Sequence, residues 1–397
     1  MDVTRFTHPI DLRAVSITDP FWQRETELVR REVIPYQWEA LNDRIPGAEK
    51  SWCMHNFRLA GRIMAQYRQQ GAQYTPQAYT YRGYDALPDD PAHPDEDKFY
   101  GFVFQDTDFS KWIEAVGYSL IQHPDKALEA TADEAIDVVC AAQTPEGYLD
   151  TYYIINGMDG VFQSLRDHHE LYCLGHLIEG AVSYYQATGK DKLLRAACRF
   201  ADYVADFFGT ADGQCKGYPG HEIAEMALVR LYEVTQDEKY LRLSRFFINE
   251  RGQEPNYFVE EERRNAEREH RPVRSVNLAY HQAVKPVREQ DEAMGHAVRA
   301  VYLYSGMADV ARMTGDDSLK SACERIWRSI VQEKLYITGG IGATQIGEAF
   351  SYAYDLPNDT AYSETCAAIG LAFFARRMLQ MSPQREYGDV MELALYN

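Results

Sequence analysis

Five short polar turns recur along the chain, and each is followed by a segment with helical spacing. The turns lie at 123–125, 188–190, 235–237, 314–316 and 382–384. After each turn, apolar residues return every three or four positions, which places them on one face of an α-helix. A helical segment also precedes each turn, so the sequence predicts a series of antiparallel helix pairs.

Three Gly-His pairs indicate which helices are internal. The pairs are Gly175-His176, Gly220-His221 and Gly295-His296. We expect each pair to open a helix that is apolar nearly all round, as burial on every side requires, whereas the segments after the polar turns suit an outer layer. Alternating inner and outer helices predict an all-α (α/α)6 toroid over residues 21–397, preceded by a short extended arm at 1–20. The histidines would then gather at one mouth, where they could donate to sugar hydroxyls or bind a metal.

Composition and charge exclude several classes of partner. The net charge of −19 disfavours a nucleic-acid backbone or an anionic membrane. No apolar run reaches 18 residues, and the N-terminal segment has no signal-peptide core. Seven widely spaced cysteines without a CxxC pair favour a reducing, cytoplasmic compartment. A homodimer stays open, and the mixed charge run at 259–271 is interpreted as a solvated helix or loop.

The stretch from 338 to 366 is the strongest candidate for a functional site. It combines several carboxylates and a cysteine with tyrosines and glycines, namely Glu348, Asp355, Asp359, Glu364 and Cys366. A long loop of this kind is more typical of a site than of a connector. A pair of carboxyl groups can carry out glycoside hydrolysis. The sequence alone leaves open which two of these four carboxylates lie close together in the fold. Asp355 and Asp359 flank Leu-Pro-Asn and are interpreted as turn-forming residues.

Glu364 and Cys366 lie two positions apart next to the start of a predicted helix. Residues at this spacing diverge within a helix but share a face of an extended segment, so both can reach one point if the helix begins near Thr365. A carboxylate and a thiolate at one point favour a borderline metal such as zinc. Zinc needs four ligands, so the spacing leaves two interpretations: part of a zinc site, or a buried cysteine at a helix start.

Five long segments, in order along the chain, carry a resemblance to a known family. They are GFVFQDTDFSKW (101–112), PEGYLDTYY (145–153), RDHHELYCLGHLIEGAVSYY (166–185), EQDEAMGHAVRAVYLYSGMADV (289–310) and GEAFSYAYDLPNDTAYSETCA (347–367). They resemble the β-L-arabinofuranosidases of glycoside hydrolase family 127, over roughly residues 20 to 397. The resemblance implies an (α/α)6 barrel followed by β-sandwich domains, and release of L-arabinose from β-L-arabinofuranosides with retention of configuration.

The resemblance also implies roles for individual residues. The family uses a zinc-bound cysteine nucleophile, and one Glu and three Cys hold the zinc. Glu364 and Cys366 match the zinc-binding Glu and the first Cys, and Glu348 matches the general acid/base that protonates the leaving oxygen and then activates water. Zinc would make a thiolate available at neutral pH. The sugar-contacting residues of the family match His169, His221, His296 and Glu392.

The chain departs from the family pattern after its last cysteine. In the family a Cys-Cys pair, which includes the nucleophile, follows the barrel, but no cysteine follows Cys366 here. The β-sandwich domains are also missing from the sequence. We therefore expect a barrel and a zinc site that are incomplete at the C-terminal side, and a 397-residue chain that alone is inactive or nearly so. Two alternatives stay open: another α/α-toroid sugar hydrolase that uses Glu348 without metal, and a non-catalytic sugar-binding scaffold.

Overall fold

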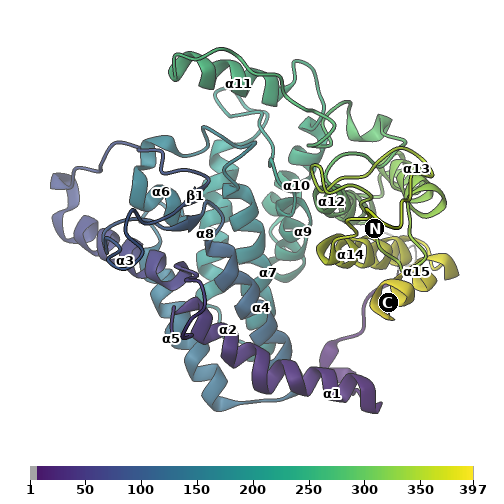
Figure 1. Ribbon diagram of the computed structural model, residues 1–397, viewed down its shortest axis with the longest axis horizontal. Helices are drawn as coiled ribbons and strands as arrows, with labels where there is room; N and C mark the ends of the chain where they lie inside the picture. The colour runs from purple at the N-terminus through teal and green to yellow at the C-terminus, as the bar shows by residue number, and fades with distance from the viewer. Residues whose placement is uncertain (1–6, 397) are drawn as a thin grey trace. The chain divides into compact units, whose positions relative to one another are not determined.

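Helices dominate both compact units of the protein (Figure 1). The computed structural model describes residues 7–396, so the first part of the predicted arm at 1–20 lies outside the described residues. One unit, here the N-terminal unit, comprises Ile10–Ser164 and His168–Phe207. The other, the C-terminal unit, comprises Leu165–Asp167, Phe208–Asn397 and the residues up to Pro9. The predicted all-α class is confirmed, since the described residues form only one two-stranded ladder.

The N-terminal unit is a set of paired helices with one small β-ladder. Its α-helices are α1 (Pro20–Leu28), α2 (Ile34–Leu41), α3 (Cys53–Gln70), α4 (Asp106–Gln122), α5 (Lys126–Ala142), α6 (Thr151–Asn156), α7 (Glu170–Thr188) and α8 (Lys192–Phe207). A π-helical turn at Val29–Val33 joins α1 to α2, and 3₁₀ turns lie at Leu12–Ala14, Gly71–Gln73 and Met158–Gly160. Strands β1 (Asp85–Ala86) and β2 (Gly101–Phe102) pair antiparallel.

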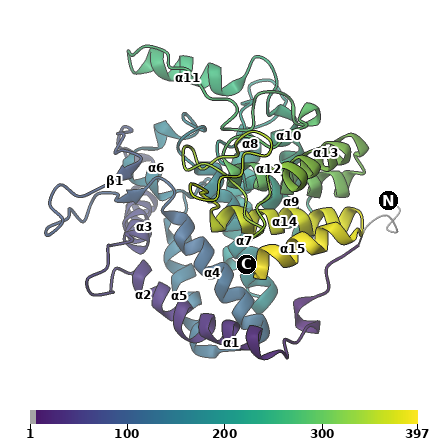
Figure 2. The same cartoon turned by 45° about the vertical axis from the view of Figure 1, so that its right-hand side comes forward.

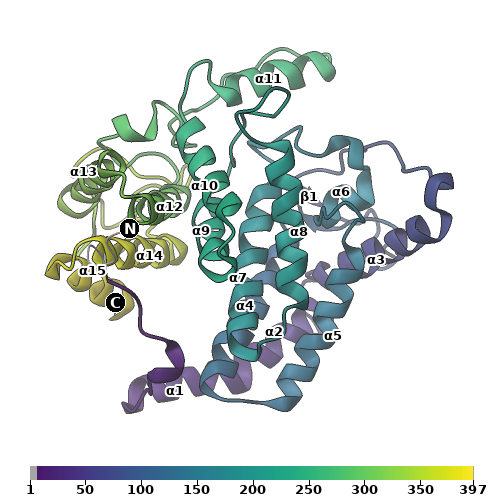
Figure 3. The same cartoon turned by 180° about the vertical axis from the view of Figure 1, so that it is seen from behind.

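Helices α4 and α7 form the closest helix pair of this unit and run side by side (Figure 3). Glycines on both helices allow the approach. A Cβ at Gly117 would lie 2.7 Å from the backbone carbon of Ser183, and a Cβ at Gly180 would lie 2.6 Å from the carbonyl oxygen of Ser110. Because α7 is buried along most of its length, it is an inner helix as the sequence predicts.

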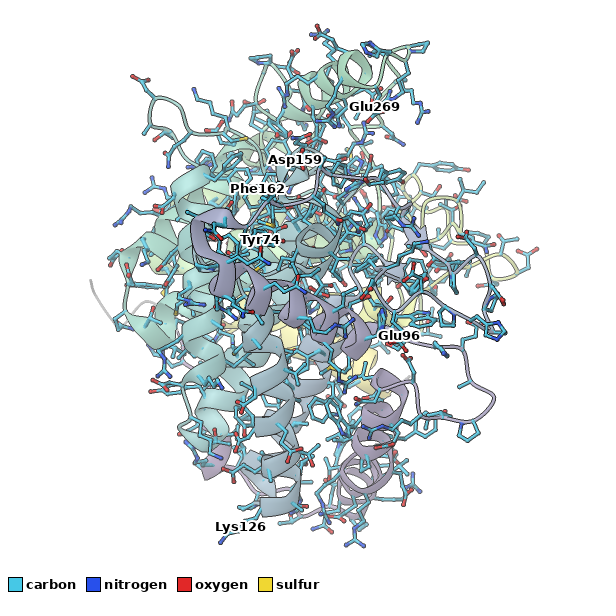
Figure 4. All side chains as sticks on the ribbon, turned by 90° about the vertical axis from the view of Figure 1, so that its left-hand side faces the viewer. Tyr74, Glu96, Lys126, Asp159, Phe162 and Glu269 are labelled. Carbon is cyan, nitrogen blue, oxygen red and sulfur yellow. The ribbon has the colours of Figure 1, made fainter. Side chains whose placement is uncertain are left out.

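The short polar turns and the long loops lie at opposite ends of the N-terminal unit. Lys190, in the turn after α7, lies 2.5 Å from carboxylates of Glu129 and Asp133 near the start of α5. Figure 4 shows Lys126, the first residue of α5, at one end, and Asp159 and Phe162 at the other. The loop that leads to His169 therefore belongs to the end away from the polar turns.

The C-terminal unit is built around one fully buried helix. Its α-helices are α9 (Ala224–Thr235), α10 (Glu238–Glu250), α11 (Tyr257–Arg268), α12 (Ala297–Thr314), α13 (Asp317–Glu333), α14 (Thr365–Met381) and α15 (Arg385–Tyr396), with a 3₁₀ turn at Val287–Glu289. Every residue from Ala297 to Arg312 of α12 is buried. This helix packs against α9, α13 and α14, and α15 packs on α14 (Figure 2). The prediction of an internal helix is confirmed for α12.

Helices α10 and α13 follow polar turns and bury only one face. Their first turns are capped by side chains of the turns themselves: Asp237 accepts from the backbone N–H of Lys239, and Asp316 from that of Leu319. An aspartate at this position satisfies N–H groups that lack partners within the helix. The predicted starts of these two outer helices are confirmed.

The charge run at 259–271 is helical as far as Arg268, but the interpretation of it as solvated is wrong for two carboxylates of α11. Glu261 accepts hydrogen bonds from the N–H groups of Leu165 and Arg166, at 2.8 and 3.1 Å, and burial raises its pKa to about 7. Glu262 is also buried, and its hydrogen bond with Arg271 lowers its pKa to about 2. The sequence pattern did not reveal the partners of Glu261, because Leu165 and Arg166 lie almost a hundred residues away from it in the chain.

In the described part of the chain, no helix combines the length and apolarity that crossing a membrane requires. The seven cysteines form no disulfide among the described residues, and only Cys366 is exposed.

Candidate functional site

The carboxylate of Glu348 is held by two side chains of the C-terminal unit. The hydroxyl of Tyr362 donates to Oε1 at 2.8 Å, and Nε2 of His296 lies 3.0 Å from Oε2. The Glu348 side chain is nevertheless partly exposed, so a ligand can reach it. An oriented, accessible carboxylate is what the predicted acid/base role requires.

Backbone hydrogen bonds place Glu348 beside the start of α12. The N–H of Ala297 donates to the carbonyl of Glu348 at 3.0 Å, and the N–H of Phe350 donates to the carbonyl of Gly295 at 2.9 Å. Glu348 itself has a φ of 50°, in the left-handed region that non-glycine residues rarely adopt. The loop is thus fixed to the helix by its main chain, and the strained residue is the one with the candidate function.

His296 caps α12 and is a neutral imidazole. Burial, together with the nearby Arg299 guanidinium, lowers the pKa of His296 to about 4. Its Nδ1 accepts from the backbone N–H of Arg299 at 3.4 Å, so the single ring proton is on Nε2. The Nε2–H group of neutral His296 therefore donates a hydrogen bond to Oε2 of Glu348.

His221 lies next to His296, with 5.6 Å between the ring centroids. Its Nδ1 is 3.0 Å from the backbone carbonyl of Glu222, and because a carbonyl only accepts, Nδ1 carries a proton. Both residues stand just before inner helices, α9 and α12, as predicted for their Gly-His pairs. The structure thus brings together three of the predicted site residues, His221, His296 and Glu348.

The third Gly-His pair does not open a helix. Gly175 and His176 lie inside α7, which begins at Glu170, so that prediction is wrong. His169 precedes the helix instead, with a left-handed φ of 58° that turns the chain into α7. His176 is buried, and burial lowers its pKa well below the usual value, as in a core histidine.

Two buried arginines fix the segments that carry these histidines. Nη1 of Arg299 donates to the carbonyl of Gly220 at 2.7 Å and to Nδ1 of His281 at 2.9 Å. The guanidinium of Arg251 donates to the carbonyls of Pro219 and His281, at 2.6 and 2.8 Å. Sequence analysis missed both arginines, because their partners are mostly backbone carbonyls far away in the chain.

Two glutamates share the buried region of Arg251. Nη1 of Arg251 is 2.8 Å from Oε1 of Glu222, and Nη2 is 3.3 Å from Oε1 of Glu225. Burial raises the pKa of Glu222 to about 8, although Arg251 acts in the opposite direction. Burial thus works against the charged form of Glu222, which follows His221 directly in the chain.

In the N-terminal unit, His169 is surrounded by aromatic rings. The ring centroids of Phe104, Tyr172 and Tyr84 lie 5.1, 5.5 and 5.7 Å from its own. The neighbouring His168 contacts the hydroxyl of Tyr153 through Nδ1 at 2.6 Å. An imidazole in an aromatic environment suits a sugar-contacting role.

The acidic residues of the loops at 99–112 and 145–153 have structural partners. Asp106 accepts from the N–H of Thr151 at 2.8 Å, and Asp150 caps α6 by accepting from the N–H of Tyr152 at 3.1 Å. Both aspartates are buried, and burial raises the pKa of Asp106 to about 6. Asp106 thus joins one loop to the other, whereas Asp150 caps the helix of its own segment.

Glu364 and Cys366 have features of metal ligands but do not form a complete set. Helix α14 begins at Thr365, and Oε2 of Glu364 is buried without a hydrogen-bond partner, whereas Cys366 is exposed. The hydrogen bond to Glu348 raises the pKa of Tyr362 to about 12, and the charges of Glu364 and Cys366 contribute to this shift. The Glu364 carboxylate and the Cys366 thiol therefore both lie near the Tyr362 hydroxyl. Among residues 7–396 there is no cluster of three His, Cys, Asp or Glu suited to a metal.

The interpretation of Cys366 as a buried residue is wrong, because its position two residues into α14 leaves it exposed. Glu392 is exposed on α15 and has no hydrogen bond or ion pair within the described structure. Helix α15 does meet the candidate loop, since a Cβ at Gly339 would lie 3.0 Å from the Cα of Ala394. Among the described residues, no hydrogen bond or ion pair connects Glu392 with Glu348, Tyr362 or His296.

Comparison with known proteins gives consistent matches along almost the whole chain. The model of the β-L-arabinofuranosidase GH127 catalytic domain matches residues 14–397. A non-reducing end β-L-arabinofuranosidase of Bifidobacterium longum subsp. longum is 39% identical over 96% of this chain and 56% of its own length.

Solved structures agree with this match. The crystal structure of a GH127 β-L-arabinofuranosidase from Geobacillus stearothermophilus T6 has 47% identity and a TM-score of 0.85, over 96% of this chain and 55% of that one. A second GH127 β-arabinofuranosidase has 38% identity and a TM-score of 0.80, over 98% and 54%. The chain spans about half the length of these relatives.

Proposed function

Since the chain belongs to glycoside hydrolase family 127, we propose that it carries the acid/base and sugar-binding residues of a β-L-arabinofuranosidase that releases L-arabinose. The observation that supports this proposal is the arrangement of Glu348. Its carboxylate accepts one hydrogen bond on each oxygen, from Tyr362 and from neutral His296, and remains partly exposed.

Glu348 acts as the general acid/base. In its acid form it protonates the glycosidic oxygen while a nucleophile bonds to the anomeric carbon, so that the leaving alcohol departs as a neutral molecule. The resulting carboxylate then takes a proton from the water that displaces this nucleophile from the anomeric carbon, which completes hydrolysis and restores the acid form. His296 and Tyr362 orient the carboxyl group during both steps, because each donates to a different oxygen.

His221 and His296 bind sugar hydroxyls, with His169 and Glu392 as further contacts. A neutral imidazole has one donor and one acceptor nitrogen, and either can hydrogen-bond to a sugar hydroxyl beside or in place of its protein partner. Burial holds the pKa of His296 near 4, so it keeps this pattern throughout the neutral range.

Glu364 and Cys366 supply two ligands of a zinc ion. The buried, unpartnered Oε2 of Glu364 and the exposed thiol of Cys366 are ligand types that a four-coordinate zinc site takes. When bound, zinc supplies a lowered pKa for the thiols that coordinate it. Retention of configuration through a cysteine nucleophile is part of the same proposal and rests on family membership.

Binding and turnover of anomeric pairs test the proposal. Calorimetry with methyl β-L-arabinofuranoside is expected to show binding that the α-anomer does not show. Any release of L-arabinose from an aryl β-L-arabinofuranoside should fall to background in Glu348→Gln, while binding survives. Hydrolysis or binding of a different sugar, with no response to β-L-arabinofuranosides, would overturn it.

Two further outcomes distinguish the alternatives. Turnover that is unaffected by chelators, with no zinc in the purified protein, identifies a metal-free hydrolase. Binding without turnover in both the original protein and Glu348→Gln identifies a sugar-binding scaffold. The cysteine pattern supports a cytoplasmic location, and sedimentation tests whether the protein forms a homodimer.

A further inference from the structure

Four aromatic rings gather beside His169 in the N-terminal unit. They belong to Tyr81, Tyr84, Phe102 and Phe104 and are here called the aromatic platform. Three of them are strongly exposed: Tyr81 by 59%, Tyr84 by 42% and Phe102 by 41%. A fixed cluster of exposed rings is unusual on a protein surface unless it binds a partner.

Tyr84, Phe102 and Phe104 contact one another, and Tyr81 contacts a neighbouring histidine. Phe102 and Phe104 stack at 5.1 Å with an angle of 7° between their planes, and Tyr84 meets both edge-on at 6.1 and 5.9 Å. Tyr81 stacks on His168 at 5.6 Å. Because Tyr84 and Phe104 also contact His169, the aromatic platform is continuous with a proposed sugar contact.

The backbone under the aromatic platform is held in place. The N–H of Val103 donates to the carbonyl of Tyr84 at 2.9 Å, next to the pairing of β1 with β2. The buried side chain of Gln105 accepts from the N–H of Phe102 at 3.0 Å. Rings on a fixed backbone lose little conformational freedom when they bind, which favours recognition.

The charge around the aromatic platform favours a neutral occupant. Asp85 follows Tyr84 and is exposed, and the whole chain has a net charge of −19. Phosphate or sulfate groups would be repelled. A saccharide fits, since its C–H faces pack on aromatic rings and its hydroxyls bond to polar neighbours. Arg82, between Tyr81 and Tyr84 in the chain, has a buried Nε without a hydrogen-bond partner.

We propose that the aromatic platform, together with His169, binds a neutral β-L-arabinofuranosyl oligosaccharide. This inference rests on the proposed function, because His169 is its link to the sugar-binding residues. The platform would thus favour ligands longer than a monosaccharide glycoside, because a second sugar can stack on its rings.

Calorimetry with two ligands tests the inference. The ligands are methyl β-L-arabinofuranoside and a disaccharide with β-L-arabinofuranose at its non-reducing end. Tyr81→Ala/Phe102→Ala is expected to bind the disaccharide about tenfold more weakly, which corresponds to about 1.4 kcal/mol, and to bind the methyl glycoside unchanged. Tyr81→Phe should keep disaccharide binding, because the stacking ring remains. Tyr36→Ala, on the exposed surface of α2, is the matched control and should bind both ligands normally.

The outcomes separate this inference from the proposed function. Equal disaccharide binding by the double variant and the original protein would overturn the aromatic platform alone. Failure of the original protein to bind either ligand would overturn both proposals. If sedimentation shows that the double variant instead breaks up a dimer, the occupant is a second copy of the chain and the saccharide assignment is wrong.

Discussion

The hydroxyl of Tyr362 lies 2.8 Å from Oε1 of Glu348 and is one of the two side-chain donors to this carboxylate. Tyr362→Phe removes only this hydroxyl. A hydrogen bond to a charged group contributes about 1.5–3 kcal/mol, so we expect at least a tenfold loss in the kcat of any aryl β-L-arabinofuranoside hydrolysis that the original protein shows. The affinity for methyl β-L-arabinofuranoside should change little.

Tyr352→Phe provides the control for this variant. Tyr352 belongs to the same loop and is exposed, but contributes nothing to the Glu348 carboxylate. It should retain full kcat and sugar affinity. Equal kinetic constants for Tyr362→Phe and the original protein would show that the Tyr362 hydrogen bond does not orient Glu348 for reaction.

Gly295 and Gly315 have nearly the same backbone conformation, with φ of 73° and 67°, but different surroundings. A Cβ at Gly295 would lie 2.0 Å from the carbonyl oxygen of Ala279, whereas nothing lies within 4 Å of a Cβ at Gly315. Gly315→Ala should therefore cost about 1 kcal/mol for its left-handed backbone alone. Gly295→Ala should cost about 3 kcal/mol or more, because the backbone before His296 must move.

Thermal unfolding of these two glycine variants measures the difference. The Gly295→Ala variant should also lose affinity for methyl β-L-arabinofuranoside, since His296 is displaced, while Gly315→Ala binds normally. Similar melting temperatures for the two variants would mean that the close approach at Gly295 relaxes without strain.

Glu222 makes folding stability depend on pH. Burial raises its pKa to about 8 from the ordinary 4.5, so the folded chain holds a proton that the unfolded chain releases. The resulting stabilisation is complete below pH 4.5 and is lost as the pH rises towards 8. Glu222→Gln cannot lose this proton, so we expect its melting temperature to exceed that of the original protein by several degrees at pH 9.

The difference at Glu222 should shrink as the pH falls, and melting curves from pH 6 to pH 9 measure it. Glu261, whose pKa is raised to about 7, also makes the folded chain less stable as the pH rises through the lower part of this range. It does so equally in both proteins, so it does not affect the difference between them. His296 acts in the opposite sense, because a lowered pKa destabilises the folded chain as the pH falls from 6.5 to about 4. A pH-independent gap between the two proteins would show that Glu222 is ionised throughout.

Cobalt(II) reports on the proposed metal ligands. A thiolate bound to this ion produces a charge-transfer absorption band, so titration of the protein is expected to give a weak band that Cys366→Ser abolishes and Glu364→Gln reduces. Cys140→Ser is the control, because Cys140 lies in α5 of the other unit and should leave the band intact. A band that survives in Cys366→Ser would assign the thiolate to another cysteine.

The sequence contained enough information for the helical architecture and for part of the site. Helix α12 was predictable because its segment is apolar nearly all round, and Glu348 stood out within the family-like segment at 347–367. Tyr362 was not separable from Tyr352 and Tyr354 by composition. Only the folded loop shows that Tyr362 meets Glu348 while the other two are exposed.

Backbone conformation and distant partners explain what the sequence did not reveal. The pair Gly175-His176 resembles the other two pairs, but the left-handed turn at His169 starts α7 earlier and leaves His176 in the core. Arg251 stood in a segment with ordinary outer-helix spacing. Its role depends on the carbonyls of Pro219 and His281, each about thirty residues away, and no local pattern encodes such contacts.

The left-handed backbone of Glu348 has a consequence for protein engineering. Glycine or asparagine tolerates this conformation better than glutamate, so selection for thermal stability alone is expected to favour replacements at position 348. Such a replacement removes the carboxylate that the proposed reaction needs. A library screened by heat alone would therefore enrich stable, inactive proteins at this position, and a useful screen must retain sugar turnover as a second criterion.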